Sequence, residues 1–245
     1  MIGIIGAMSI EVEGILAEME NISVKCIGGI DFSVGRISGK QIVVAKSGVG
    51  KVNAAMCAQA MIISFPVAAV INLGVAGAIS SELNIGDAVV SRDLVQHDMR
   101  TSAFGGYALG QVPGLDVVAF SADAALVKSA LLACETVFSG SSHNAYCGTI
   151  ATGDQFVDSA LTKQEIRDNF GAFCVEMEGA AIAQVCYLNH IPFVAIRAIS
   201  DKADGSAETD FVTFAIKAAA HSAKIAAKMI DCYISFNSQP AAHLK

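Results

Sequence analysis

Short, uninterrupted apolar runs recur along the chain and alternate with segments whose apolar residues return every three or four positions. The runs are typical of buried strands, and the second pattern is typical of helices. The pattern predicts strands within residues 2–8, 28–48 (a hairpin), 67–79, 86–98, 146–157, 172–179 and 191–204. It predicts helices within residues 9–20, 51–64, 123–135, 158–170, 180–190 and about 209–235.

Strands that alternate with helices favour an α/β domain with a mostly parallel or mixed sheet. We find neither an internal repeat nor a linker, so we expect one domain over residues 1–236 and a C-terminal tail over residues 237–245. Ser9 is the expected N-cap of the first helix, and Asp158 or Thr162 that of the helix before Phe170.

Composition and charge exclude several kinds of protein. Of the 245 residues, 53% are hydrophobic and 16% charged, which favours elements buried on more than one side and leaves apolar surface for a subunit interface. The net charge of -7, without a basic run, makes a nucleic-acid partner unexpected. No apolar run reaches the ~18 residues of a membrane span, and the N-terminus lacks a signal peptide, so we expect a cytoplasmic protein without a membrane partner.

Cysteine and histidine add no metal or redox motif. The seven cysteines are scattered without a CxxC, and most have apolar neighbours, as small core residues in a reducing cytosol do. The five histidines show no metal-ligand spacing, so neither a metal nor another cofactor is expected.

Unusual polar residues follow five of the expected strands. In α/β sheets, ligands bind at the carboxyl ends of the strands. The residues at these ends are Glu11, the turn Gly74–Gly77, Asp154, the pair Glu176 and Glu178, and Asp201. We therefore expect a functional site at that edge of the sheet. A loop over residues 98–116, with four glycines, is long enough to be functional as well.

Structural roles compete with the functional ones at these positions. Glu11 fits the first turn of a helix, and Asp201 fits a turn after a strand. Arg197 lies within an apolar strand and needs a carboxylate partner, for which Glu176 is the candidate. One of Glu176 and Glu178 could equally cap the following helix while the other pairs with the arginine. "IGIIGAM" lacks the GxGxxG of a dinucleotide site, and "KSGVGKV" lacks two residues of a phosphate-binding P-loop.

The segments "SGVGKVNAA", "NLGVAGA", "GTIATGDQFV", "VEMEGAAIAQVC" and "RAISDKAD", with "HD…SAF…QVPG" in the long loop, resemble the 5'-methylthioadenosine/S-adenosylhomocysteine nucleosidases of the nucleoside phosphorylase superfamily. The resemblance runs in order from Ile2 to about residue 235. It implies a single-domain, three-layer α/β/α fold with a central mixed, twisted sheet flanked by helices. It also implies a homodimer and an N-glycosyl hydrolase that releases adenine from a small nucleoside in methionine salvage.

The same resemblance implies roles for individual residues. Asp201 would protonate N7 of adenine, and Glu11 would activate the attacking water. Glu178 would accept the ribose hydroxyls. Other contacts to the substrate would come from Met8, Val75, Ala76, Gly77, Phe156, Val157, Glu176, Met177, Arg197, Ser200 and Phe211. Phe104 and Pro113, in the long loop, would close the 5' pocket of the partner subunit.

The chain departs from the family pattern in two places, and the first is the segment from Asn72 to the turn at Val75. Val75 replaces a serine that many relatives carry, and Asn72 stands where the phosphorylases have a phosphate-binding arginine. These residues favour water over phosphate as the nucleophile. The second departure is "AETDF", which weakens the alignment of Phe211. A phosphorylase and a catalytically silent nucleoside-binding protein remain as alternatives. The substrate range, including 5'-deoxyadenosine and 6-amino-6-deoxyfutalosine, stays open.

Overall fold

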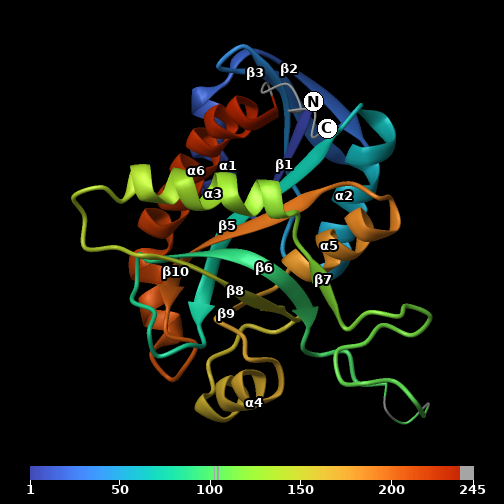
Figure 1. The fold of residues 1–245 in the computed structure, drawn as a ribbon, viewed down its shortest axis with the longest axis vertical. Helices are drawn as coiled ribbons and strands as arrows, with labels where there is room; N and C mark the ends of the chain where they lie inside the picture. The colour runs from blue at the N-terminus through green and yellow to red at the C-terminus, as the bar shows by residue number, and fades with distance from the viewer. Residues whose placement is uncertain (102, 104, 238–245) are drawn as a thin grey trace, which may run out of the picture.

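The computed structural model describes residues 1–101, 103 and 105–237, which form helices on both sides of a sheet (Figure 1). The strands are β1 (Ile2–Gly6), β2 (Glu20–Ile27), β3 (Ile30–Ile37), β4 (Lys40–Lys46), β5 (Ala69–Ala78), β6 (Ala88–Gln96), β7 (Ala119–Ser121), β8 (Ala145–Thr152), β9 (Cys174–Glu176) and β10 (Phe193–Asp201). The helices are α1 (Ser9–Glu18), α2 (Lys51–Ser64), α3 (Ala124–Val137), α4 (Ala160–Phe170), α5 (Gly179–Leu188) and α6 (Ala207–Asn237). This arrangement confirms the predicted α/β class.

The described strands form one mixed sheet in the order β10-β6-β8-β9-β5-β1-β4-β3-β2, and β7 pairs with β6. Parallel pairs join β1 to β4 and β5, and β8 to β6 and β9. β10 lies parallel to β5 and antiparallel to β6. Because β10 pairs with both, strands β5, β9, β8, β6 and β10 close into a ring. The ring gathers the ends of β5, β8, β9 and β10 around one space.

Two apolar cores lie on opposite faces of the sheet. Helices α1, α3 and α6 pack together over one face, where Ile15 and Met229 are fully buried. Helices α2 and α5 pack over the other, where Met61 and Cys186 are fully buried. Figure 1 shows these two groups of helices on either side of the strands. The predicted layers of helix, mixed sheet and helix are therefore confirmed.

Two strands and two helix caps differ from the sequence prediction. β2 was missed because nearly all of its residues are exposed, so no alternation marks a buried face. β7 has only three residues. Met8, not Ser9, occupies the N-cap position of α1, and Ser159 stands at that of α4 without a capping side-chain bond, so Asp158 and Thr162 were wrong.

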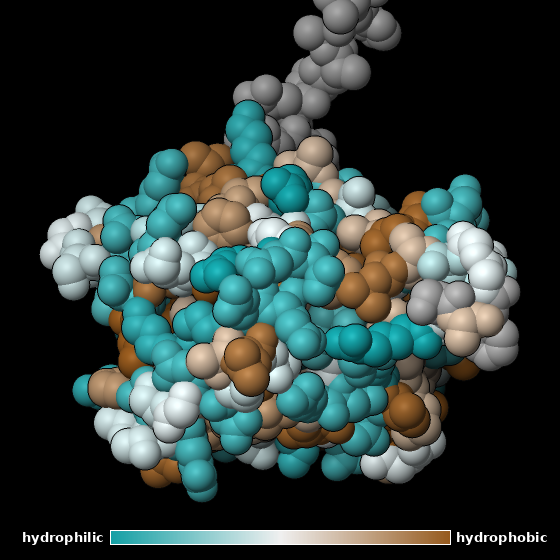
Figure 2. Space-filling view, turned by 90° about the horizontal axis from the view of Figure 1, so that it is seen from below, coloured by the Kyte–Doolittle hydropathy of each residue, from teal (hydrophilic) through white to brown (hydrophobic). Residues whose placement is uncertain are grey.

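A long loop joins β6 to β7, as predicted, and Gly110 N donates to Met99 O at 3.0 Å within it. Viewed from below Figure 1, the surface around α4 and this loop is mostly hydrophilic, with scattered hydrophobic side chains (Figure 2). The chain end over 238–245, most of the expected tail, lies outside the described residues, and Asn237 ends α6.

Candidate active site

A cavity of about 260 Å³ opens where the carboxyl ends of β1, β5, β9 and β10 meet. Charged groups in its wall are all carboxylates. The lining residues are Ala7, Met8, Glu11, Val49, Val75, Ala76, Gly77, Gln155, Phe156, Val157, Val175, Glu176, Met177, Glu178, Ser200, Asp201 and Phe211. The cavity therefore unites the expected residues of four of the five strand ends. Asp154, the residue expected from the fifth, does not line it and accepts the N–H of Lys51 at 2.8 Å.

Glu11 lies in the first turn of α1 and is held by backbone donors alone. Its Oε2 accepts N–H bonds from Ala7 at 2.7 Å and Met8 at 2.9 Å, and its Oε1 accepts one from Val75 at 3.0 Å. A Cβ at Gly74 would approach Oε1 to 2.5 Å, so only glycine leaves room for the carboxylate. Burial raises the pKa of Glu11, and the positive charge of Arg197 opposes this.

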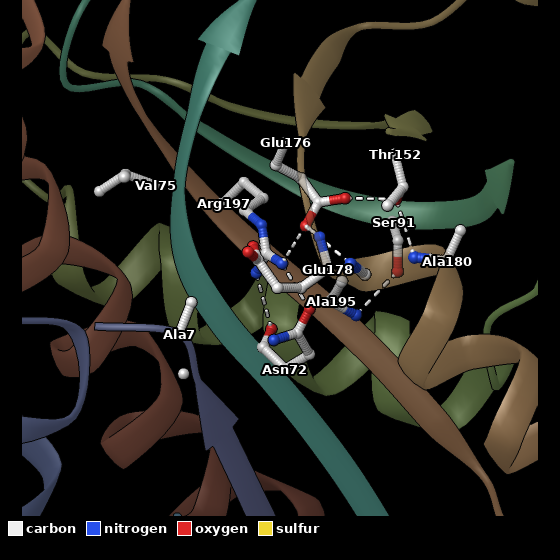
Figure 3. Close-up of polar contacts among 12 residues, drawn as sticks. Ala7, Asn72, Val75, Ser91, Thr152, Glu176, Glu178, Ala180, Ala195 and Arg197 are labelled. Carbon is white, nitrogen blue, oxygen red and sulfur yellow. Dashed lines mark hydrogen bonds and ion pairs between the residues drawn. The ribbon is translucent and has the colours of Figure 1, made fainter. Parts of the chain in front are cut away.

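Glu176 anchors a buried polar network behind the cavity (Figure 3). Its Oε2 accepts from Arg197 Nη2 at 2.6 Å and from the N–H groups of Glu178 at 3.0 Å and Gly179 at 2.7 Å. Its Oε1 accepts from the hydroxyl of Thr152, which in turn accepts from the N–H of Ala180 at 2.8 Å. Glu176 thus both caps α5 and pairs with the arginine.

Because Glu176 fills both structural roles, Glu178 is free to face the cavity. Its Oε1 accepts one N–H bond, from Gly50 at 2.7 Å, where the chain enters α2 with φ at 96°. Burial, and next the charge of Glu176, raise the pKa of Glu178 to about 7. The Gly50 N–H and the charge of Arg197 oppose this rise. Glu178 therefore exchanges its proton near neutral pH.

Asp201 ends β10 on the opposite wall. Its Oδ1 accepts the Ala203 N–H at 2.9 Å, and its Oδ2 accepts the Ser200 hydroxyl at 2.8 Å. Burial raises the pKa of Asp201, although both hydrogen bonds oppose the rise. A Cβ at Gly77 would come within 2.7 Å of Oδ1, so this glycine keeps the acid accessible. Such an environment suits a carboxylic acid that donates a proton.

Apolar side chains supply the rest of the wall. Phe156 and Phe211 meet edge to face, with ring centroids 5.7 Å apart. Phe156 is 44% exposed, a large value for an aromatic ring, and offers a stacking surface for a flat ligand. Met8 and Met177 line the same cavity and can pack against the ring of a sugar.

Some expected residues lie elsewhere. Arg197 does not line the cavity: it is 2% exposed and lies behind Glu176, where its Nη2 also contacts Asn72 Oδ1. Pro113 is exposed in the long loop, and Phe104 lies outside the described residues.

Sequence reasoning missed four residues of the wall: the apolar Ala7, Val49 and Val175, and the uncharged polar Gln155. Each stands one or two positions from a predicted site or motif residue, and this adjacency was the only available signal.

The described part of the chain holds no group of three or more His, Cys, Asp or Glu side chains arranged to bind a metal ion. None of its helices combines the length and apolar character needed to cross a membrane.

Four acidic side chains around one cavity, at the ends of a partly closed mixed sheet, define an enzyme of the nucleoside-processing kind, and comparison with known proteins agrees. A family model described as the phosphorylase superfamily matches residues 1–231. A 5'-methylthioadenosine/S-adenosylhomocysteine nucleosidase of Staphylococcus haemolyticus is 39% identical over 94% of this chain and 99% of its own length. That of Geobacillus kaustophilus is 43% identical, covering 93% and 95%.

Solved structures place the fold in the same group. The nucleosidase of Neisseria meningitidis in complex with methylthio-immucillin-A has a TM-score of 0.89 and 42% identity, covering 94% of this chain and 97% of that one. The futalosine hydrolase of Helicobacter pylori has a TM-score of 0.87 and 37% identity at the same coverage. The chain belongs to the 5'-methylthioadenosine/S-adenosylhomocysteine nucleosidase family of the phosphorylase superfamily.

Proposed function

We propose that this protein hydrolyses the N-glycosidic bond of 5'-methylthioadenosine and S-adenosylhomocysteine, releasing adenine and the 5'-thio-ribose product in methionine salvage and in recycling of S-adenosylmethionine by-products. The observation that carries the proposal is the convergence of Glu11, Glu178 and Asp201 on one cavity. Each carboxylate has different hydrogen-bond partners, so each can take a different part in the reaction.

Asp201 acts as the general acid. Adenine leaves readily only when N7 is protonated, and an ordinary aspartic acid has lost its proton at neutral pH. Burial raises the pKa of Asp201, which favours its protonated form relative to that of an exposed aspartic acid. Proton transfer by a positioned acid typically raises the reaction rate about 10²–10⁴-fold.

Glu11 positions and deprotonates the attacking water. Two backbone N–H groups hold Oε2 and a third holds Oε1, which fixes the carboxylate at the wall of the cavity. The raised pKa of Glu11 makes it a stronger base than an exposed glutamate.

Water, and not phosphate, is the proposed nucleophile. Glu11 already accepts the Val75 N–H in the turn where the phosphorylases of the superfamily bind phosphate. Asn72 turns away from the cavity and contacts Arg197, and the described wall contains no Lys or Arg. A phosphate dianion would therefore meet a carboxylate instead of a cation, which disfavours the phosphorylase alternative.

Glu178 and Met177 hold the ribose. A carboxylate that accepts two hydroxyls also stabilises the positive charge that develops on the sugar as the base leaves. The buried pair of Glu176 and Arg197 supports Glu178 from behind, because Glu176 binds the Glu178 N–H at 3.0 Å. Arg197 acts at a distance from the substrate.

The aromatic end of the cavity takes the adenine. Phe156 stacks on the purine, the backbone of Val157 reads its Watson–Crick edge, and Phe211 contacts the sugar and the 5' region. Ser200 supports the catalytic acid through its 2.8 Å bond to Asp201 Oδ2. The remaining contacts come from residues that line the cavity without polar side chains: Met8, Val75, Ala76 and Gly77.

We propose that the protein is a homodimer in which the partner subunit completes the 5' pocket of the active site. Exposed apolar side chains form a face over α2 and α5, the α2–α5 apolar face, made of Val49, Val52, Met56, Ile63, Tyr187 and Leu188. Val49 belongs both to this face and to the cavity wall, so the face reaches the site. A second copy seated there could bring Pro113 and Phe104 of its long loop to the 5' substituent.

We further propose that the protein works in the cytoplasm. Cys26 and Cys147 are free and exposed, and Cys57, Cys134 and Cys174 are free and buried. Exposed free thiols fit a reducing compartment.

An adenine-release assay tests the function. Purified protein is incubated without phosphate with 5'-methylthioadenosine, S-adenosylhomocysteine, 5'-deoxyadenosine or 6-amino-6-deoxyfutalosine, and adenine or the corresponding free base and the sugar product are quantified. We expect release from the first two, with the futalosine hydrolase neighbour making the fourth a natural further substrate. A requirement for phosphate with a sugar 1-phosphate product would overturn hydrolysis, and tight binding without turnover would favour a binding protein.

A further inference from the structure

A second hollow, of about 480 Å³, lies apart from the active site and is unusually basic. It is bounded by the turn before β6, the turn before β8 and the middle of α6. Its polar lining consists of His143, Lys217, His221 and Lys224, and Ile85 and Phe214 contribute apolar surface. It shares no lining residue with the cavity that holds Glu11 and Asp201.

The two histidines are held by packing rather than left loose on the surface. Gly86, with φ at 94°, lets the ring of His143 lie against its backbone, where any Cβ would collide with the imidazole. The carbonyl of the same glycine lies 3.1 Å from His221 Nδ1. The two rings are 5.0 Å apart, and Phe138 packs against both. The sequence therefore builds a fixed imidazole pair at this position.

No carboxylate balances these basic groups. Within the described structure, Lys217 and Lys224 have no hydrogen-bond or ion-pair partner, and the lining contains no Asp or Glu. Asp87, beside Gly86, accepts hydrogen bonds from the N–H groups of Asn84 and Asn144, one with each carboxylate oxygen and each at 2.8 Å.

Acids on the surrounding elements, among them Glu82, Glu135, Glu208 and Asp210, do not line the hollow either. Four basic side chains in a lining without an acidic residue are unexpected in a chain of net charge -7, and a bound anion would account for them.

We propose that this hollow is a binding site for a phosphate monoester. Two ammonium groups and two imidazoles supply the donors that a phosphate dianion requires, and an ion bound there would relieve their mutual repulsion. The apolar surface of Ile85 and Phe214 accommodates a small organic group attached to the phosphate. Because α6 lies on the face of the sheet opposite to α2 and α5, the hollow stays open in the proposed homodimer.

Protonation of the histidines should strengthen binding. Burial lowers the pKa of His221, the Gly86 carbonyl opposes this, and the charges of His143 and Lys224 lower it further. A bound dianion favours the charged imidazole, so by linkage the dissociation constant should fall as the pH falls from 8 to 6.5. Over most of this range the monoester, with a second pKa of about 6, remains a dianion.

The test uses glycerol 3-phosphate as the probe, with glycerol and inorganic phosphate as comparisons. Titration calorimetry on the full chain, with adenine present to occupy the active site, measures the dissociation constant at pH 8 and 6.5. We expect binding of glycerol 3-phosphate, weaker binding of inorganic phosphate and none of glycerol. The double variant Lys217→Ala/Lys224→Ala should weaken binding at least about tenfold.

Two further variants separate the site from general charge effects. Lys228→Ala removes the same charge from the same helix outside the hollow and should leave binding unchanged. His221→Gln should reduce the pH dependence, and titration of the parent protein should shift the ring protons of both His143 and His221.

Equal weakening by Lys228→Ala, or unchanged binding in the double variant, would overturn the proposal. Binding of inorganic phosphate as tight as that of glycerol 3-phosphate would overturn the assignment to a monoester. Adenine release by the variants, assayed separately, tests the catalytic function independently.

Discussion

At the scale of single residues, the site depends on carboxyl groups kept from their ordinary ionisation. Asp201, Glu178 and Glu11 are all buried in one cavity, and burial is the largest cause of the raised pKa in each. Backbone N–H groups hold all three in place. The raised pKa values favour proton transfer to and from these groups.

Replacing Asp201 by asparagine should stop the transfer of a proton to the base. The amide keeps the size of the side chain and its contact with Ala203 N, so the fold should persist. We expect adenine release to fall by about 10²–10⁴, measured as kcat under saturating substrate, with an unchanged circular dichroism spectrum. Asp204→Asn, three positions away and outside the cavity, is the matched control. Near-normal turnover in Asp201→Asn would contradict the assignment of the acid.

Replacing Glu178 by glutamine should separate stability from activity. Its folded pKa of about 7 lies above its ordinary value of 4.5, so its ionisation opposes folding: the stability is complete below pH 4.5 and declines as the pH rises through 7. At pH 8, Glu178→Gln should therefore be more stable than the parent by roughly 1–3 kcal/mol, yet lose most of its turnover. At pH 4 the difference in stability should vanish.

Urea unfolding at pH 4 and pH 8 measures this difference, and the exposed Glu208→Gln serves as the control. A Glu178→Gln variant less stable than the parent at pH 8 would show that the carboxylate stabilises the fold instead of serving the substrate.

At the scale of elements, the junction of β9 and α5 gives its two glutamates different roles. The carboxylate of Glu176 points to Arg197 and Thr152 and accepts N–H bonds where α5 begins (Figure 3). Glu178 makes none of these contacts with its side chain and lines the cavity. The sequence pattern allowed each glutamate one structural role. The structure assigns both structural roles to Glu176, because its two oxygens reach Arg197, Thr152 and two free N–H groups of α5.

Glu176→Gln should mainly cost stability. The substitution leaves the guanidinium of Arg197 buried beside a neutral amide, and loss of one partner of a buried ion pair typically costs about 3–5 kcal/mol. Urea unfolding at pH 7 measures the loss. The exposed pair of Arg100 and Glu165 offers a control, since Glu165→Gln should change stability by less than about 1 kcal/mol. A stable but inactive Glu176→Gln would mean that Glu176 acts directly on the substrate.

The strands predicted most clearly from the sequence alone are those that are buried along their whole length. β1, β5 and β10 are buried along their whole length and appear in the sequence as apolar runs. β2 lacks a buried face, and the second pairing of β10 depends on contacts between distant segments, so neither leaves a local pattern. In the site, polar residues at strand ends were visible, whereas Val49 and Gln155 line the cavity only through the folding of neighbouring turns.

At the scale of the whole molecule, the side of the sheet covered by α2 and α5 exposes several large apolar side chains. The α2–α5 apolar face carries large side chains in the open, among them Val52 at 75% and Ile63 at 72% exposure. Large apolar side chains exposed together in this way often mark an interface. Because Val49 continues the face into the cavity, assembly and substrate binding should depend on each other.

Placing charges on this face should therefore dissociate the proposed homodimer and lower activity together. We expect the double variant Val52→Glu/Ile63→Glu to sediment as a monomer, since two buried carboxylates facing their symmetry mates in an apolar interface have no partners. Its KM for 5'-methylthioadenosine should rise more than its kcat falls, because the catalytic carboxylates stay in place while the partner loop no longer closes the 5' pocket. Val24→Glu, on the exposed β2, introduces a charge at a similarly exposed apolar position and should change neither property. If the double variant remains dimeric, the interface lies elsewhere on the molecule. A fully active monomer would show that one chain completes the 5' pocket alone.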